Sequence, residues 1–442
     1  MSERFRMWLA QLNPTVGDLA ANADTARAAW EKARDAGADM IAFPEMFLTG
    51  YQLQDLVKKP AFAMDVHRVM GELAATCTDG PAIGIGGPLP GGAKPFNAYY
   101  VLQDGEISAT VLKHHLPNYN VFDEKRYYHS GDPAGPVRVG PLRIGVPICE
   151  DAWFEDVTET LAETGAEILL VPNGSPYHRG KMDVRQAQMV ARVVETGLPL
   201  VYLNLLGGQD DQVFDGASFV LNPHGRLTHQ MPAFEEGLFE VIFERGEEGW
   251  HALEGEKAHL PDTWEADYRT MVLSLGDYMR KAGFGKAVLG LSGGVDSALV
   301  AAIACDALGP ENVRCVMLPS RYTSEASLTD ARAVAERLGC RLDTVSIGGA
   351  HVAVTDALSE LFAGLEPDLA EENIQSRLRG VMLMALSNKF GEMLLTTGNK
   401  SEVAVGYSTI YGDMAGGYKS RISTRPASFR PAAGATPITG RG

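Results

Sequence analysis

Short apolar runs alternate with amphipathic stretches along the first part of the chain. Apolar runs that predict strands lie at residues 5–12, 40–43, 143–148, 168–171 and 200–205. Between the first two of them, apolar positions at helical spacing over residues 22–36 predict a helix. Strands and helices in this order are typical of α/β folds.

The pattern stops near residue 245 and then resumes. Residues 246–262 are polar and aperiodic, so we predict a linker between a first domain, 1–245, and a second domain, 263–418. Helices are predicted at 263–282, 298–308 and 325–338, and strands at 287–291, 313–318 and 342–346. This order predicts a parallel α/β sheet for the second domain. Residues 419–442 lose the pattern and form a basic tail.

Composition narrows the classes of function. Of the 442 residues, 45% are apolar and 21% are charged, which excludes a disordered, collagenous or coiled-coil protein. The net charge is −17, so we expect neither a nucleic acid nor a membrane as partner, and an anionic substrate must be met by a local site. No apolar run reaches about 18 residues, and the first residues lack the apolar stretch of a signal peptide. We therefore expect a cytoplasmic protein.

Cysteines and histidines give no sign of a zinc site or of a disulfide framework. The five cysteines are scattered and lack Cys-x-x-Cys spacing. His114 and His115 are neighbours, and neighbouring side chains on a strand point to opposite faces, so we expect no metal between them.

Three predicted strands of the first domain each end in a polar, reactive residue. Glu45, Lys113 and Cys149 follow the runs that end at residues 42, 112 and 148. Hydrolysis of an amide by a thiol needs a nucleophile, a base and a cation for the developing oxyanion, and these three residues supply them. Each residue alone is more often a core thiol or a solvated charge.

The segments around these residues resemble the nitrilase (carbon–nitrogen hydrolase) superfamily. The matching words are Phe-Pro-Glu-Met-Phe-Leu-Thr-Gly-Tyr (43–51), Lys-His-His-Leu-Pro-Asn-Tyr (113–119), Val-Phe-Asp-Glu-Lys-Arg-Tyr (121–127) and Pro-Ile-Cys-Glu-Asp-Ala-Trp (147–153). The resemblance implies an α-β-β-α sandwich with Glu45 as base, Lys113 as oxyanion partner and Cys149 as nucleophile. It also implies that Glu124 is a supporting carboxylate. The residues that would hold glutamine are Tyr119, Ser175 and Lys181.

A glycine-rich turn in the second domain has the chemistry of a phosphate cradle. In Ala-Val-Leu-Gly-Leu-Ser-Gly-Gly-Val-Asp-Ser-Ala-Leu-Val (287–300), a strand runs through a turn into a helix whose N–H groups can meet an anion. No lysine follows the glycines, and the Gly-x-Gly-x-x-Gly fingerprint is absent, so this is neither a Walker loop nor a dinucleotide motif. A plain strand-to-helix turn is the structural alternative. The Ser-Gly-Gly-Val-Asp-Ser word resembles the N-type ATP pyrophosphatases, whose loop grips pyrophosphate.

Three further motifs narrow the resemblance of the second domain to the NAD synthetases. Together with the first domain, they point to the glutamine-dependent members of that family. These motifs are Glu-Glu-Asn-Ile-Gln-Ser-Arg-Leu-Arg (371–379), Thr-Thr-Gly-Asn-Lys-Ser-Glu (396–402) and Tyr-Gly-Asp-Met-Ala-Gly-Gly (411–417). The resemblance implies a doubly wound, adenine nucleotide alpha hydrolase-like domain that amidates deamido-NAD through an adenylate, with ATP, Mg²⁺ and ammonia from glutamine. It also implies a homo-oligomer.

The implied ligand residues of this domain fall into three sets. The ATP residues are Gly290, Leu291, Ser292, Gly293, Gly294, Val295, Asp296, Ser297 and Thr397. The deamido-NAD residues are Asn373, Arg377 and Glu402, and the Mg²⁺ ligands are Asp296 and Glu402. A helical salt bridge is the structural alternative for Arg377.

The tail departs from the family pattern. Residues 419–442 hold five Lys or Arg and no Asp or Glu, as in a disordered basic segment. Codons can be chosen for it whose shifted frame spells a family-like Val-Lys-Asp-Leu-Tyr-Lys run, so we interpret the tail as a frameshift near residues 417–419 that truncates the domain. The alternative functions are a glutaminase or amidase alone, or a non-catalytic ATP-binding partner subunit.

Overall fold

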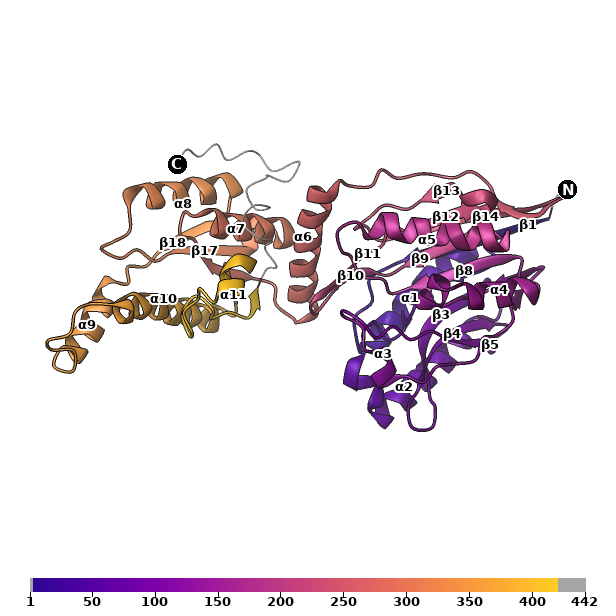
Figure 1. Ribbon diagram of the computed structural model, residues 1–442, viewed down its shortest axis with the longest axis horizontal. Coiled ribbons are helices and arrows are strands. Elements are labelled where there is room, and N and C mark those ends of the chain that lie inside the picture. The colour runs from indigo at the N-terminus through magenta and orange to yellow at the C-terminus, as the bar shows by residue number, and fades with distance from the viewer. Residues whose placement is uncertain (1–2, 420–442) are drawn as a thin grey trace. The chain divides into compact units, whose positions relative to one another are not determined.

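The computed structural model describes residues 3–419, which fall into two compact units (Figure 1). The first unit is Met1–Thr263 and the second begins at Trp264. The tail prediction lies outside the described residues, apart from Lys419. No helix among residues 3–419 is both long and apolar enough to cross a bilayer.

The first unit contains a seven-stranded mixed sheet. Its strands, in spatial order, are β15 (Gly249–Ala252), β14 (Gly237–Gly246), β1 (Arg4–Gln11), β2 (Met40–Ala42), β3 (Ala82–Leu89), β4 (Phe96–Gln103) and β5 (Glu106–Leu112). The inner strands β1, β2 and β3 are parallel, and the outer pairs are antiparallel. Helices α1 (Leu19–Asp35) and α2 (Pro60–Ala74) and the 3-10 turn η1 (Gln54–Lys58) accompany this sheet.

The second sheet of this unit has six strands. In spatial order they are β13 (Arg226–Gln230), β12 (Phe219–Asn222), β9 (Leu200–Asn204), β8 (Ile168–Asn173), β7 (Leu142–Gly145) and β6 (Val137–Val139). The other elements are α3 (Glu124–Tyr127), η2 (Cys149–Trp153), α4 (Glu155–Glu163), α5 (Lys181–Thr196), η3 (Pro223–Gly225) and the hairpin of β10 (Leu206–Gln209) and β11 (Gln212–Asp215).

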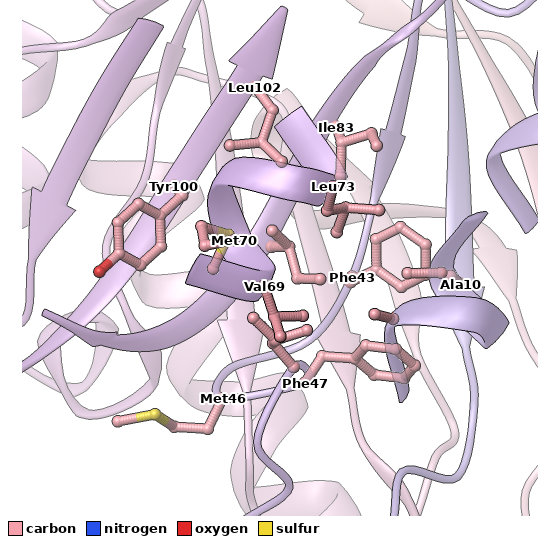
Figure 2. Packing of buried hydrophobic residues seen from close by; sticks show 14 of the residues in the cluster. Ala10, Phe43, Met46, Phe47, Val69, Met70, Leu73, Ile83, Tyr100 and Leu102 are labelled. Atoms are coloured by element: carbon pink, nitrogen blue, oxygen red, sulfur yellow. The ribbon is translucent and has the colours of Figure 1, made fainter. Parts of the chain in front are cut away.

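Three apolar layers hold the first unit together. Inward side chains of both sheets, such as Leu9 and Ile144, share one buried cluster, so the sheets face each other. A second cluster lies between the first sheet and its helices, where Val69 and Met70 of α2 pack near Ile83 (Figure 2). A third cluster joins the second sheet to α4 and α5. The expected α-β-β-α sandwich is confirmed.

The predicted linker at 246–262 is wrong in its first part. Residues 249–252 form β15, which pairs with β14, and Trp250 is only 4% exposed. The following segment also stays on this unit, because the amide of Ala258 donates to the carbonyl of Gln230. The error arose because a single buried Trp in a polar run shows no periodicity, although one aromatic residue can anchor an edge strand.

The second unit is a doubly wound parallel sheet, as expected. Its strands, in spatial order, are β18 (Arg341–Thr344), β17 (Val313–Met317), β16 (Ala287–Gly290), β19 (Met393–Thr396) and β20 (Tyr418–Lys419), and each adjacent pair is parallel. The helical elements are α6 (Thr263–Lys281), α7 (Val295–Leu308), η4 (Pro310–Asn312), α8 (Glu325–Leu338), α9 (Gly348–Leu358), α10 (Leu369–Phe390) and α11 (Lys400–Val405).

Both faces of this sheet are covered. Leu289 packs in a cluster with α6, α7 and α8, and its neighbour Val288 packs on the other face against α10. Strand order reverses between β16 and β19, and in open α/β sheets ligands bind beyond the carboxyl ends of the strands at such a point. The glycine-rich turn follows β16 there. Helix α7 begins at Val295, three residues before its predicted start, so the turn is shorter than its sequence indicates.

Gly86 of β3 is a position where the fold tolerates no side chain. A Cβ atom there would lie 2.1 Å from the backbone nitrogen of Met46 and 2.7 Å from the carbonyl carbon of Glu45. We therefore expect Gly86→Ala to destabilise the first unit by about 3 kcal/mol, because two buried backbones must separate. Chemical denaturation followed by circular dichroism measures this. Gly92→Ala is the matched control, since a Cβ at Gly92 meets nothing within 4 Å. Equal stabilities of the two variants would contradict the prediction.

Candidate active site

Cys149 lies at a tight turn just beyond β7. It is the first residue of η2, has a positive φ of 48° and is 4% exposed. The turn is held by Asp151, whose Oδ2 accepts the N–H of Ile148 at 3.0 Å. A non-glycine residue in the left-handed region is strained, and such strain is kept where surrounding contacts fix it.

Glu45, Lys113 and Glu124 form a buried cluster of charges. The Nζ of Lys113 lies 2.7 Å from Oε1 of Glu45 and 2.9 Å from Oε2 of Glu124. The side chains of Glu45 and Lys113 are fully buried, and that of Glu124 is 3% exposed. Glu45 follows β2 and Lys113 follows β5, so the ends of two strands of one sheet bring them together. The structure thus unites these three residues as the sequence predicted.

Uncharged donors complete this cluster, and sequence reasoning missed them. The side-chain amide of Asn97 donates to Oε1 of Glu45 at 2.7 Å and to Oε1 of Glu124 at 3.1 Å. The hydroxyl of Tyr51 donates to the same Glu124 oxygen at 2.9 Å, and the N–H of Gly174 donates to Oε2 of Glu45 at 2.8 Å. Asn97 lies within the apolar strand β4. A single polar residue inside an apolar strand is the sequence signal that could have identified Asn97.

Burial and mutual charge set the protonation of this cluster. Burial disfavours the ammonium of Lys113, but Glu124 and Glu45 outweigh it and raise its pKa well above the usual value. Burial, together with the carboxylate of Glu45, raises the pKa of the Cys149 thiol well above its usual value, and Lys113 opposes this rise. The resting state is therefore a neutral thiol beside a charged lysine.

The three predicted glutamine residues surround the same region. The hydroxyl of Tyr119 donates to both carboxylate oxygens of Glu150, at 3.0 and 2.9 Å. Lys181 opens α5 with its Nζ 4.2 Å from the ring centre of Trp153. Burial and then Arg185 lower the pKa of Lys181, whereas Cys149 and Glu150 favour its charge. Glu150 was missed although it directly follows Cys149 in the sequence.

Ser175 is held by a buried polar network. Arg185, which is fully buried, donates to the hydroxyl of Ser175 at 3.2 Å and to its carbonyl at 2.6 Å, and pairs with Asp215 at 2.9 Å. The side chain of Asn204 accepts the N–H of Ser175 at 3.0 Å and donates to its carbonyl at 3.1 Å. These contacts hold the backbone of Ser175 at both its N–H and its carbonyl, and they give its hydroxyl one donor.

A cavity of about 600 Å³ opens on the side of the Tyr119–Glu150 pair. Tyr119 and Glu150 line it, and so do His114, His115 and His129. The prediction that His114 and His115 point to opposite faces is wrong. They follow β5 in irregular chain rather than within a strand, and their ring centres are 4.7 Å apart.

In the second unit, the glycine-rich turn has the shape of an anion cradle. Gly293 has a φ of +85°, and a Cβ there would lie 2.4 Å from the carbonyl oxygen of Ser327. The hydroxyls of Ser292 and Ser297 lie 3.1 Å apart, and Ser297 also donates to the carbonyl of Gly294. The turn therefore presents the N-terminus of α7 with a fixed backbone.

Other predicted ligands lie near the end of β19. Asn399, which is fully buried, donates from its amide to Asp296 at 3.2 Å and exchanges hydrogen bonds with Glu402 at 2.9 Å each. Asp296 and Glu402 thus both contact Asn399: Asp296 accepts from its side-chain amide, and the carboxylate of Glu402 accepts from its backbone N–H. Thr397 follows β19, which pairs with β16, so it lies at the same sheet edge as the turn.

Asn373 and Arg377, unlike Glu402, do not contact Asn399 in the hydrogen bonds seen among the described residues. Both lie on α10 and contact the chain that follows α11: Asn373 accepts from the hydroxyl of Thr409 at 2.9 Å, and Arg377 donates to the carbonyl of Ile410 at 3.2 Å. No salt bridge of Arg377 is seen among the described residues. The structure thus gives these two residues a local bracing contact.

Two protein-family models together match most of the chain. The carbon-nitrogen hydrolase family model matches residues 9–246, and the NAD synthase model matches residues 267–422. A glutamine-dependent NAD(+) synthetase of Rhodobacter capsulatus is 63% identical over 95% of this chain and 76% of its own length. The chain belongs to the glutamine-dependent NAD(+) synthetase family. It spans about three quarters of that relative.

Solved structures of the family agree with the fold. The glutamine-dependent NAD(+) synthetase of Acinetobacter baumannii, in complex with adenosine diphosphate, is 36% identical with a TM-score of 0.90. It covers 97% of this chain, which covers 81% of it. That of Cytophaga hutchinsonii has a TM-score of 0.82 at 24% identity, over 94% of this chain and 78% of its own, and shows the fold alone.

Glu124 gives the first unit a pH-dependent stability. Burial raises its pKa to about 7 from 4.5, Lys113 opposes this rise and Glu45 adds to it. The folded protein then keeps a proton that the unfolded chain releases, so this stabilising contribution is present below pH 4.5 and is lost as the pH rises through 7. In the parent protein, Glu124 lowers the free energy of unfolding by up to about 3 kcal/mol as the pH rises from 4.5 to 8. We expect this pH-dependent decrease to be absent in Glu124→Gln.

Urea denaturation at several pH values measures this slope. The exposed Glu31→Gln on α1 is the control and should leave the slope as in the parent. A slope unchanged in Glu124→Gln would contradict the assignment, whatever the absolute stability of that variant.

Proposed function

We propose that the chain makes NAD from deamido-NAD, ATP and ammonia, and that it takes this ammonia from glutamine. The observation that carries this is that both family models match one chain, each over a unit with its own polar site. For this reason the coupled ligase is favoured over a glutaminase alone. The chain is accordingly an ATP-dependent carbon–nitrogen ligase.

In the first unit, we assign the chemistry to Cys149, Glu45 and Lys113. Because burial keeps the thiol of Cys149 protonated, it needs a base, and Glu45 is the carboxylate that acts on its pKa. As the sulfur attacks the amide carbon, the oxygen becomes negative and Lys113 stabilises it. Glu45 then returns the proton to the leaving ammonia, and water hydrolyses the thioester to glutamate.

The α-ammonium and α-carboxylate groups of glutamine need an acidic and a basic partner, respectively. We assign its ammonium group to Glu150, whose carboxylate already accepts from Tyr119, and its carboxylate to Lys181. Ser175 is held by Arg185 and Asn204 and supplies a neutral contact. The supporting role of Glu124 is to keep Lys113 charged and oriented.

In the second unit, the turn from Gly290 to Ser297 with the N-terminus of α7 is suited to the phosphates of ATP, and Thr397 lies at the same edge. The nicotinate carboxylate attacks the α-phosphorus, the bond to the β-phosphate oxygen breaks and pyrophosphate leaves. Ammonia then attacks the acyl carbon of the adenylate, and AMP leaves with the bonding electrons. We assign deamido-NAD to Asn373, Arg377 and Glu402, with the first two acting through the segment that they brace.

The residues present fit Mg²⁺. Asp296 and Glu402 are carboxylates that both accept hydrogen bonds from Asn399, and hard oxygen donors are what Mg²⁺ prefers. When bound, Mg²⁺ would neutralise charge on the phosphates. The homo-oligomeric state and the cytoplasmic location stay predictions.

The nucleophile is tested by Cys149→Ala. We expect glutamate release from glutamine to fall at least 10³-fold, because the covalent step is lost, while NAD formation with added ammonia keeps the parent rate. Cys77→Ala is the matched control, since Cys77 is another buried thiol of the same unit. Glutamine hydrolysis at the parent rate in Cys149→Ala would remove the assignment.

The cation site is tested by Asp296→Asn. A carboxylate beside bound phosphates is unfavourable unless a cation lies between them, so we expect the Mg²⁺-dependent part of ATP affinity to fall at least tenfold. Calorimetry with and without Mg²⁺ measures it, and the exposed Asp330→Asn on α8 is the control. Glutamine hydrolysis should be unaffected. An unchanged Mg²⁺ dependence would exclude Asp296 as a ligand.

A further inference from the structure

Three side chains with metal-binding atoms meet on the first unit. One ligand atom each of His114, His115 and Asp156 lie within 4.8 Å of one another. Among residues 3–419, no other group of three histidine, cysteine or acidic side chains brings its ligand atoms this close together. Two imidazoles and a carboxylate are a ligand set of zinc and other transition-metal sites in proteins.

The first imidazole is already in the tautomer that a metal requires. The Nδ1 of His114 lies 2.7 Å from the carbonyl oxygen of Gly131. A carbonyl only accepts, so Nδ1 carries the hydrogen and Nε2 keeps its lone pair. Metal-bound histidines are commonly oriented in this way by a hydrogen bond from the other ring nitrogen.

The second imidazole is fixed against its carboxylate. The Nε2 of His115 lies 2.9 and 3.0 Å from the two oxygens of Asp156, and its ring packs on Phe154 with the ring centres 4.3 Å apart. Ligands about 2.0 Å from a tetrahedral metal lie roughly 3.3 Å from one another. This pair is therefore close to the required spacing, and only His114 has to approach.

The backbone and the surroundings also favour a cation. The N–H groups of His114 and His115 both donate to one oxygen of Asp151, at 3.0 and 2.7 Å, so the two residues cannot separate. The side chains of His115 and Asp156 are 25% and 54% exposed, so a hydrated ion can reach them and keep water in its open positions. Glu150 lines the same cavity and adds negative charge, although Lys125 lines it too.

We propose that His114, His115 and Asp156 bind one divalent transition-metal ion of the zinc, nickel or cobalt kind. The metal takes Nε2 of both histidines and one oxygen of Asp156. The proton between Nε2 of His115 and Asp156 passes to solvent, and the neutral ring of His115 then carries its hydrogen on Nδ1. The site is distinct from the proposed Mg²⁺ site, whose donors are oxygen atoms. It does not depend on the proposed function, since it needs neither glutamine nor ATP.

The test is a titration of the full chain with Co²⁺, in excess Mg²⁺ to fill oxygen-rich sites. We expect one Co²⁺ per chain by calorimetry, with a dissociation constant in the micromolar range, and d–d absorption bands without a thiolate-to-metal band. The last point matters because Cys315 and Cys340, whose sulfurs are 3.6 Å apart, are an alternative soft site.

Variants assign the ligands. His115→Ala and Asp156→Asn should each weaken Co²⁺ binding at least tenfold, and His129→Ala, which changes another residue of the same cavity, should not. Asp156 lies on the surface of α4, so its variant is expected to fold even if the histidine variant does not. Unchanged binding in Asp156→Asn, a thiolate band, or no binding below millimolar Co²⁺ would each overturn the proposal.

Discussion

The burial of Lys113 between two carboxylates is the constraint on which the first unit depends. A fully buried ammonium is tolerated only with close partners, and Lys113 has Glu45 and Glu124 at 2.7 and 2.9 Å. Two carboxylates and one lysine still leave a net negative charge, which the uncharged donors Asn97 and Tyr51 partly stabilise. If Lys113 were removed, two carboxylates would face each other without a cation in a dry interior. The same arrangement places the carboxylate of Glu45 near the neutral thiol of Cys149, so the contacts that stabilise the fold also build the proposed catalytic site.

The sandwich is what makes this cluster possible. Glu45 and Lys113 come from one sheet and Cys149 from the other, so the site forms only when the two sheets pack face to face. Asp151 links them directly, because it caps the Cys149 turn and also accepts the backbone N–H groups of His114 and His115. Burial raises the pKa of Asp151 to about 6, so this link is an anion at neutral pH. The geometry of the nucleophile is thereby coupled to the strand end that carries the lysine.

The sequence predicted local features well and long-range ones poorly. Strands such as β16 and β17 and the helix at 325–338 were found because their periodicity is local. Glu45, Lys113 and Cys149 were singled out because each stands in a recognisable motif at a strand end, and their catalytic roles stay predictions. Asn97 was missed because its partner Glu45 is 52 residues away, and no local pattern encodes such a pairing. The strand β15 was missed for another reason: it pairs with the neighbouring β14, but its polar sequence shows no periodicity. His114 and His115 were misjudged because the chain leaves the strand one residue before them.

The two sites solve opposite electrostatic problems. The Cys149 region is buried and Lys113 is already paired there, which are the conditions that the proposed attack of a thiol on an amide would need. A site for ATP receives several negative charges with its substrate, and permanent buried cations would leave it unstable when empty. Its turn instead offers backbone N–H groups, the hydroxyls of Ser292 and Ser297 and the carboxylate of Asp296, which accepts a hydrogen bond from Asn399. Gly293 is fixed for a steric reason, because the carbonyl oxygen of Ser327 leaves no room for a side chain, and the backbone N–H groups of the turn are therefore held in place without a lysine.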